Sequence, residues 1–215
     1  DPRGLTSEVR DKIIGAMMAG ELMPGDRLIL DTLADQLGVS RTPVRDALLR
    51  LVSEGIVELA DKRGYVFRQL SDAEIEHNLE SRIAIESYAA EILAKKGETG
   101  IRSARAALDE VHRTPRTSVR AFFEANMHVH RAIVAGTENP QLLSFFDTIW
   151  GQAASNQIYN QYYQSTAYET FYQDHLRLID TIALGQPDTA RAAMVKHICS
   201  GRELSRHGSN EEVRP

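Results

Sequence analysis

The chain has 215 residues, of which 42% are hydrophobic and 26% charged, as in ordinary folded proteins of one or two domains. Its net charge of -5 excludes binding to nucleic acid through overall basicity, so such binding would need a local basic patch. The single cysteine, Cys199, excludes an internal disulfide and fits a reducing compartment. No signal peptide opens the chain and no apolar run approaches the ~18 residues of a membrane span, so we expect a cytoplasmic protein without a membrane partner.

Two short helices joined by a glycine turn are expected in the first sixty residues. Apolar side chains at helical spacing predict an earlier helix over residues 5–20. The next helix is expected over residues 31–37 and ends at Gly38, because glycine tolerates the left-handed conformation that closes a helix. A further helix is expected to start at Thr42-Pro43, with the hydroxyl as cap, and to end at Gly55. This outline is that of a helix-turn-helix.

A β-hairpin is expected directly after these helices. Residues 56–59 and 65–67 have strand composition, and the segment 61–64 between them has the composition of a tight turn. The sequence therefore predicts a winged helix-turn-helix domain over residues 1–68.

Two arginines make this domain a candidate for DNA binding. Arg41 and Arg45 lie four residues apart near the start of the second helix of the pair, where a recognition helix presents side chains to base edges. Arginine can donate two parallel hydrogen bonds to guanine. A solvated helix face is the alternative explanation of the same pair. Further candidates are Ser40 and Thr42 as phosphate contacts and Arg50 and Arg63 as nearby positive charge. Gly64 is a candidate for close approach of the wing backbone to a groove.

The remainder of the chain is expected to be helical. Residues 69–78 are assigned to a linker and the start of the first long helix, residues 79–207 to a helical ligand-binding and dimerisation domain, and residues 208–215 to a mobile tail. Gly- and Pro-containing breaks predict six helices without a strand between them. The expected fold class is thus mostly α, a winged helix-turn-helix followed by an all-α six-helix bundle.

Three histidines of this domain occupy apolar helix faces. His130, His175 and His197 each belong to a different expected helix, and an imidazole buried without a partner is costly. Convergence on one metal ion would satisfy all three. The alternative is that each is a hydrogen-bonded core histidine. His128, two residues from His130 on the same helix, is expected to point away.

The first domain resembles the winged helix of the GntR family of bacterial regulators. The resemblance is most specific in the segment Gly38-Val39-Ser40-Arg41-Thr42-Pro43-Val44-Arg45 and extends over about sixty residues. It implies that Arg41 and Arg45 read guanines in a short palindrome, that Thr42 contacts the DNA backbone, and that Gly64 lies at the minor groove. Some members carry a DNA-contacting arginine where this chain has Asp31, so that contact is expected to be absent.

The second domain resembles the FCD ligand domain of FadR-like GntR regulators. The resemblance implies a divalent metal, with zinc, nickel and manganese all open, held by His130, His175 and His197 together with position 126. Metal-binding members have aspartate at that position, whereas this chain has Asn126. An amide oxygen carries no charge, so it would be a weak ligand or an outer-sphere group, and affinity for a hard cation should fall.

Arg82 and Glu86 resemble the arginine and glutamate that open the first helix of that domain. Arg82 would then face the cavity and hold the carboxylate of an organic-acid effector through two hydrogen bonds. An intrahelical Arg82–Glu86 pair is the alternative. The segment from Trp150 to Gln173 is rich in Tyr, Asn and Gln and could line a polar pocket or form a dimer surface.

Together these patterns predict a homodimeric transcriptional regulator, not an enzyme, that binds double-stranded operator DNA. Repression is commoner than activation in the family that it resembles. One rival is a metalloenzyme on a DNA-binding scaffold, with Glu86 as base, but the chain has no His-Glu-x-x-His and no Ser/His/Asp or Cys/His signature. The other is an RNA-binding or scaffolding protein, which the paired arginines disfavour.

Overall fold

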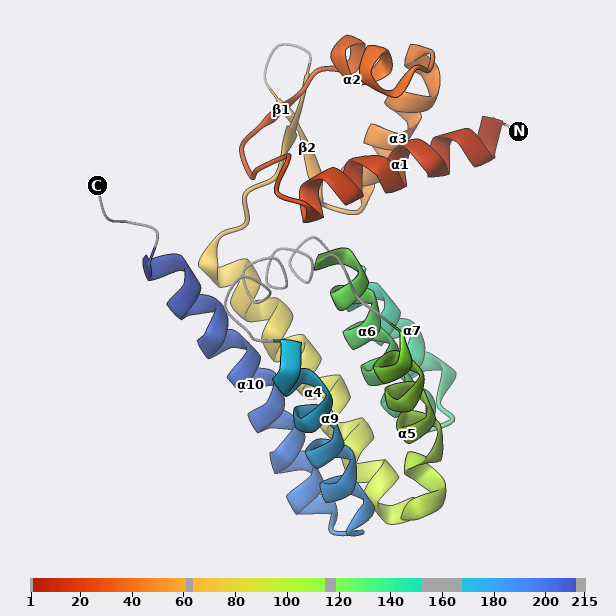
Figure 1. Ribbon diagram of the computed structural model, residues 1–215, viewed down its shortest axis with the longest axis vertical. Coiled ribbons are helices and arrows are strands. Elements are labelled where there is room, and N and C mark those ends of the chain that lie inside the picture. Colours follow the sequence, from red (N-terminus) through yellow and green to blue (C-terminus); the bar gives the residue numbers. More distant parts are fainter. Residues whose placement is uncertain (1, 61–63, 115–118, 152–167, 212–215) are drawn as a thin grey trace. The chain divides into compact units, whose positions relative to one another are not determined.

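The chain folds into two compact units, Asp1–Ser71 and Asp72–Pro215. The computed structural model describes residues 2–60, 64–114, 119–151 and 168–211 (Figure 1). Both units are mostly helical, and the first also contains a small sheet, which confirms the expected fold class. None of the helices in these ranges combines the length and the apolar character needed to cross a membrane.

The first unit is a winged helix. Its elements are α1 (Pro2–Met18), β1 (Arg27–Leu28), α2 (Leu30–Leu37), α3 (Arg41–Ser53), β2 (Val57–Ala60) and β3 (Gly64–Phe67). Gly38 ends α2 with a φ of 66°, and its N–H donates to the carbonyl oxygens of Ala34 and Asp35, as the glycine turn predicts. The apolar stripe of α3 is 0% exposed, and this stripe consists of Val44, Ala47, Leu48 and Leu51.

The start of α3 differs from the expectation. Ser40, in an extended conformation, occupies the N-cap position without a capping hydrogen bond from its side chain, so Arg41 and Thr42 already belong to the first turn. Pro43 is the third helical residue rather than the first. Its position is permitted because the first N–H groups of a helix have no partner within it, so the missing donor costs nothing. The shift places Arg41 at the very start of the helix.

The three strands form an antiparallel sheet in the order β1–β3–β2. The hairpin β2–β3 was expected, whereas β1 was not. Two residues are too few to show the alternation that identifies a strand, and β1 exists because Arg27 and Leu28 pair with Val66 and Tyr65 of β3. This pairing ties the segment before α2 to the wing.

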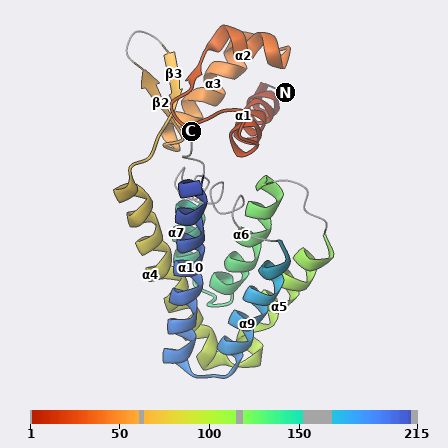
Figure 2. The same ribbon diagram turned by 60° about the vertical axis from the view of Figure 1, so that its left-hand side comes forward.

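The second unit is a helical bundle, and its described residues contain six helices and no strand. These helices are α4 (Asp72–Lys96), α5 (Glu98–Arg113), α6 (Val119–Ala135), α7 (Pro140–Trp150), α9 (Tyr168–Ala183) and α10 (Pro187–Glu211). The long helices α4 and α10 pack along each other (Figure 2). The fourth expected helix ends at Trp150, and most of the Tyr-rich segment that follows lies outside the described residues. Helix α10 continues past Gly208, where the tail was expected to begin, because a single glycine lowers helix stability without ending a helix.

Candidate nucleic-acid interface and metal centre

The arginines at the start of α3 lie on its solvent side. The buried stripe of α3 occupies one face, and Arg41, Thr42 and Arg45 are exposed on the other. The side chain of Arg41 is 68% exposed and forms an ion pair with Asp31, 2.8 Å from Nε to Oδ1. No ion pair of Arg45 is found among the described residues. Two guanidinium groups one helical turn apart are therefore accessible to a partner from outside.

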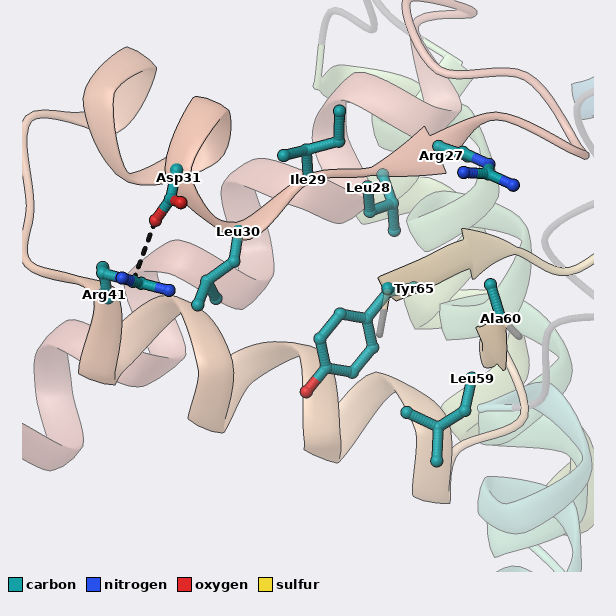
Figure 3. Close-up of a pocket in the computed structure, with 10 residues that line it drawn as sticks. Arg27, Leu28, Ile29, Leu30, Asp31, Arg41, Leu59, Ala60 and Tyr65 are labelled. Carbon is teal, nitrogen blue, oxygen red and sulfur yellow. Dashed lines mark ion pairs between the residues drawn. The ribbon is translucent and has the colours of Figure 1, made fainter. Parts of the chain in front are cut away.

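A hollow of about 530 Å³ lies beside Arg41, between the start of α3 and the wing (Figure 3). Ile29, Leu59 and Tyr65 contribute apolar walls, and Gly64 lies at the wing side. A Cβ atom built on Gly64 would meet nothing within 4 Å, so this part of the wing presents bare backbone. The start of α3 and the wing strand thus border one open surface.

The other residues proposed for DNA contact are distributed differently. Ser40 and Thr42 are exposed in the first turn of α3, beside Arg41. Arg50 lies nine residues after Arg41, two and a half turns along α3, and therefore on the opposite side of the helix. Its Nη1 is 3.5 Å from Ser7 Oγ of α1. Arg50 is thus separated from the surface formed by Arg41 and Arg45, and Arg63 lies outside the described residues.

In the helical unit, three histidines from three helices meet. His130 of α6 and His175 of α9 are buried, and His197 of α10 is partly buried. The Nε2 atom of His130 is 3.3 Å from the Nε2 atoms of both His175 and His197. His128 is exposed on the other side of α6, next to Glu110, as its position predicts. The rings meet because each sits on the inward face of its helix.

The hydrogen bonds of two rings fix which nitrogen carries the proton. His175 Nδ1 is 2.8 Å from the carbonyl oxygen of Phe171, which can only accept, so Nδ1 donates. His130 Nδ1 is 2.5 Å from Glu86 Oε2 and donates to that carboxylate. The Nε2 atoms, which are left for other partners, then face each other with lone pairs. Facing lone pairs repel each other, and a metal ion or a proton between them would relieve this repulsion.

The donor set fits a divalent metal. A tetrahedral ion with nitrogen ligands at 2.0–2.1 Å requires these nitrogens to be about 3.3–3.4 Å apart, which agrees with the two separations from His130 Nε2. Asn126 lies one turn before His130 on α6 and is 4% exposed, and its Oδ1 has no hydrogen-bond partner. A buried amide oxygen without a hydrogen-bond partner is unusual.

Glu86 connects the histidines to a buried arginine. Its Oε1 accepts from Arg82 Nε at 2.9 Å and from Trp150 Nε1 at 3.0 Å, while Oε2 faces His130. The guanidinium of Arg82 also stacks on the ring of Trp150, 4.1 Å from its centroid. Only Nε of Arg82 donates to Glu86, and no hydrogen bond of its two terminal nitrogens is found among the described residues. The intrahelical pair that the sequence offered as the alternative is therefore present, and it is made through Nε.

The ionisation states agree with this geometry. Burial alone would raise the pKa of the Glu86 carboxyl, but Arg82 and His130 together lower it to about 2. Burial, reinforced by His130, lowers the pKa of His175 to about 3. Burial likewise brings the pKa of His197 well below its ordinary value. Both of these rings are therefore neutral, which is the form that binds metal.

Sequence reasoning missed two members of this centre. Trp150 was identified only as the edge of a polar segment, yet its indole N–H holds Glu86 and its ring carries Arg82. The single tryptophan of the chain, placed beside a Tyr-rich segment, was the available signal. The carbonyl of Phe171, which orients His175, could not be found from side-chain patterns because every residue has a carbonyl.

Two family models match the chain along these two units. Residues 5–67 match the model of bacterial regulatory proteins of the gntR family. Residues 77–199, more than half of the chain, match the FCD domain model. The chain belongs to the GntR family and carries an FCD domain. It is a transcriptional regulator, not an enzyme, as the two family models and the relative named as a transcriptional repressor indicate.

Two curated relatives and one solved structure match almost the whole chain. A protein of Paenarthrobacter nicotinovorans named "Probable D-xylose utilization operon transcriptional repressor" is 26% identical over 95% of this chain and 90% of its own length. One of Escherichia coli (strain K12) named "Putative L-lactate dehydrogenase operon regulatory protein" is 28% identical over 92% of this chain and 84% of its own length. The solved structure of E. coli McbR/YncC has the same fold, with a TM-score of 0.70 at 20% identity, over 96% of this chain and 99% of that one.

Proposed function

We propose that this GntR regulator is a cytoplasmic repressor that binds a pseudo-palindromic operator as a homodimer. The observation that carries the proposal is the pair of exposed guanidinium groups, Arg41 and Arg45, at the start of α3, with the wing strand bordering the hollow beside Arg41. Arginines in this position can donate two hydrogen bonds each to guanine, and Thr42 and Ser40 can donate to phosphates. Gly64 allows the wing backbone to approach a groove.

The helical unit would be the sensor. We propose that His130, His175 and His197 hold a divalent metal, with Asn126 Oδ1 as the fourth and neutral ligand. When bound, the metal would supply positive charge that attracts an anionic oxygen of the effector. The terminal nitrogens of Arg82 would bind the carboxylate of the same molecule, so a small organic acid is the ligand class that the charges favour.

The identity of that acid does not follow from the relatives, since one is named for a sugar operon and another for a lactate dehydrogenase operon. The effector would bind the helical unit more tightly when the two recognition helices of the dimer are in one arrangement than when they are in another. Ligand binding in the bundle would thereby change operator affinity.

The Arg45→Ala variant tests the recognition surface. A duplex selected from random DNA by the wild-type chain would be titrated by fluorescence anisotropy, alongside duplexes with single base-pair changes. We expect Arg45→Ala to lose about 5- to 150-fold in discrimination at one base pair, the range for a bidentate arginine–guanine contact. Arg50→Ala is the matched control, since it removes the same charge from the opposite side of α3 and should leave discrimination unchanged. Unchanged discrimination in Arg45→Ala would refute the proposal.

A thermal-shift screen tests the sensor. The chain would be freed of metal with a chelator and heated with zinc, nickel or manganese, each with and without a panel of organic acids. A metal present at 100 times its Kd should stabilise the helical unit by about 2.7 kcal/mol. His175→Ala should abolish the shift. A wild-type chain whose melting temperature responds to none of the metals would refute a metal-dependent sensor.

A further inference from the structure

Asp31 places a carboxylate on the surface proposed to face DNA. It lies in the first turn of α2, and its Oδ1 is 2.8 Å from Nε of Arg41 (Figure 3). The ion pair is made at Nε, and Nη1 and Nη2 of Arg41 have no partner among the described residues. The guanidinium is therefore held at one edge while the fork that recognises guanine stays open.

The fold does not require this ion pair. Both side chains are about two-thirds exposed, at 64% for Asp31 and 68% for Arg41, and exposed pairs contribute little to stability. Helices α2 and α3 are already joined through buried apolar residues that include Leu33 and Val44. A carboxylate beside the DNA also repels phosphates, so its presence lowers affinity for every duplex unless recognition gains from it.

We propose that Asp31 is a positioning residue that sets sequence specificity by holding Arg41 in its base-reading orientation. The inference rests on the proposed binding of operator DNA through α3. A free arginine side chain loses rotamer freedom when it docks, which costs a factor of about 2–12 in affinity. Asp31 removes part of that loss before binding. Where the base opposite Arg41 is not guanine, Arg41 does not dock and this saving is absent, so discrimination increases, whereas the repulsion between the Asp31 carboxylate and phosphates acts on every duplex alike.

A double-mutant cycle at Asp31 and Arg41 tests this. Affinity would be measured for three duplexes: the selected operator, an operator changed at the base pair where the Arg41→Ala variant loses discrimination, and unrelated DNA. We expect Asp31→Ala to lower discrimination at that base pair by about 2- to 12-fold while raising affinity for unrelated DNA. In the Arg41→Ala background, Asp31→Ala should leave discrimination unchanged. Asp31→Asn keeps an oxygen for Nε and should retain part of the discrimination.

Asp35→Ala is the matched control, because Asp35 is an exposed aspartate of the same helix without an ion pair among the described residues. It should raise affinity for all duplexes without changing discrimination. If Asp31→Ala behaves in the same way, its role is general repulsion and the inference is wrong. It is also wrong if Asp31→Ala lowers discrimination equally without Arg41, which would mean that Asp31 reads a base itself, as a carboxylate can read the amino group of cytosine. The Arg45→Ala variant distinguishes failure of this inference from failure of the proposed DNA binding. Unchanged discrimination in Arg45→Ala would overturn the proposed DNA binding and, with it, the role of Asp31.

Discussion

Replacing Glu86 with glutamine tests how this carboxylate controls the metal-binding form of His130. Glutamine keeps one oxygen, which can accept from Arg82 Nε and Trp150 Nε1 as Oε1 does now. Its amide nitrogen then faces His130 Nδ1, and two donors cannot bond to each other. The imidazole must move its proton to Nε2, the atom that faces His175 and His197. A protonated Nε2 cannot bind a metal.

Two magnitudes follow from the contacts of Glu86. Loss of the group that orients a metal-bound histidine lowers metal affinity about 10- to 100-fold. Arg82, at 6% exposure, also loses its carboxylate, and breaking a buried ion pair costs about 3–5 kcal/mol. For a chain of this size that corresponds to a melting temperature lower by about 6–20 °C. Both effects arise from one substitution because Glu86 contacts both the arginine and the histidine.

The assay would combine thermal melting by circular dichroism with zinc titration against a chelating indicator. The titration would be done at a temperature below the melting transition of the variant. Glu91→Gln is the control, since Glu91 lies on the same helix and pairs with Lys95 and Arg191 near the surface. It should leave zinc affinity unchanged and the melting temperature close to that of the wild type. If folded Glu86→Gln binds zinc as tightly as the wild type, the carboxylate does not set the form of His130, and the argument from its hydrogen bonds is refuted.

Two further predictions concern packing and charge. A Cβ atom at Gly136 would lie 2.9 Å from the Gly100 carbonyl oxygen and 3.3 Å from Leu93 Cδ2, so Gly136→Ala should lower the free energy of unfolding by about 1–3 kcal/mol in urea titrations. Gly4→Ala, where a Cβ meets nothing within 4 Å, should leave it unchanged or raise it, and equal losses in both variants would contradict the packing argument. Operator affinity should also fall steeply with salt, with a log–log slope of about -0.9 per neutralised phosphate, and a flat response in an anisotropy series would exclude DNA binding of this kind.

Local patterns were sufficient for the elements that carry the proposed recognition surface. Gly38 closes α2 and the buried stripe of α3 leaves Arg41 and Arg45 outside, because both features depend on a few neighbouring residues and the period of the helix. Strand β1 and the cap at Ser40 were not found in this way. A two-residue strand exists only through its pairing with β3, and several polar residues near the start of α3 could have capped it.

The sequence by itself determined that three histidines would lie on inward helix faces, since the spacing of apolar residues decides which side of a helix is buried. Whether those faces would meet was decided only by the packing of α6, α9 and α10, which brings His130 Nε2 within 3.3 Å of both other rings. Packing also joined Glu86 to Trp150 and Asp31 to Arg41. Contacts between residues far apart in the chain depend on how whole elements pack, and no local pattern contains that information.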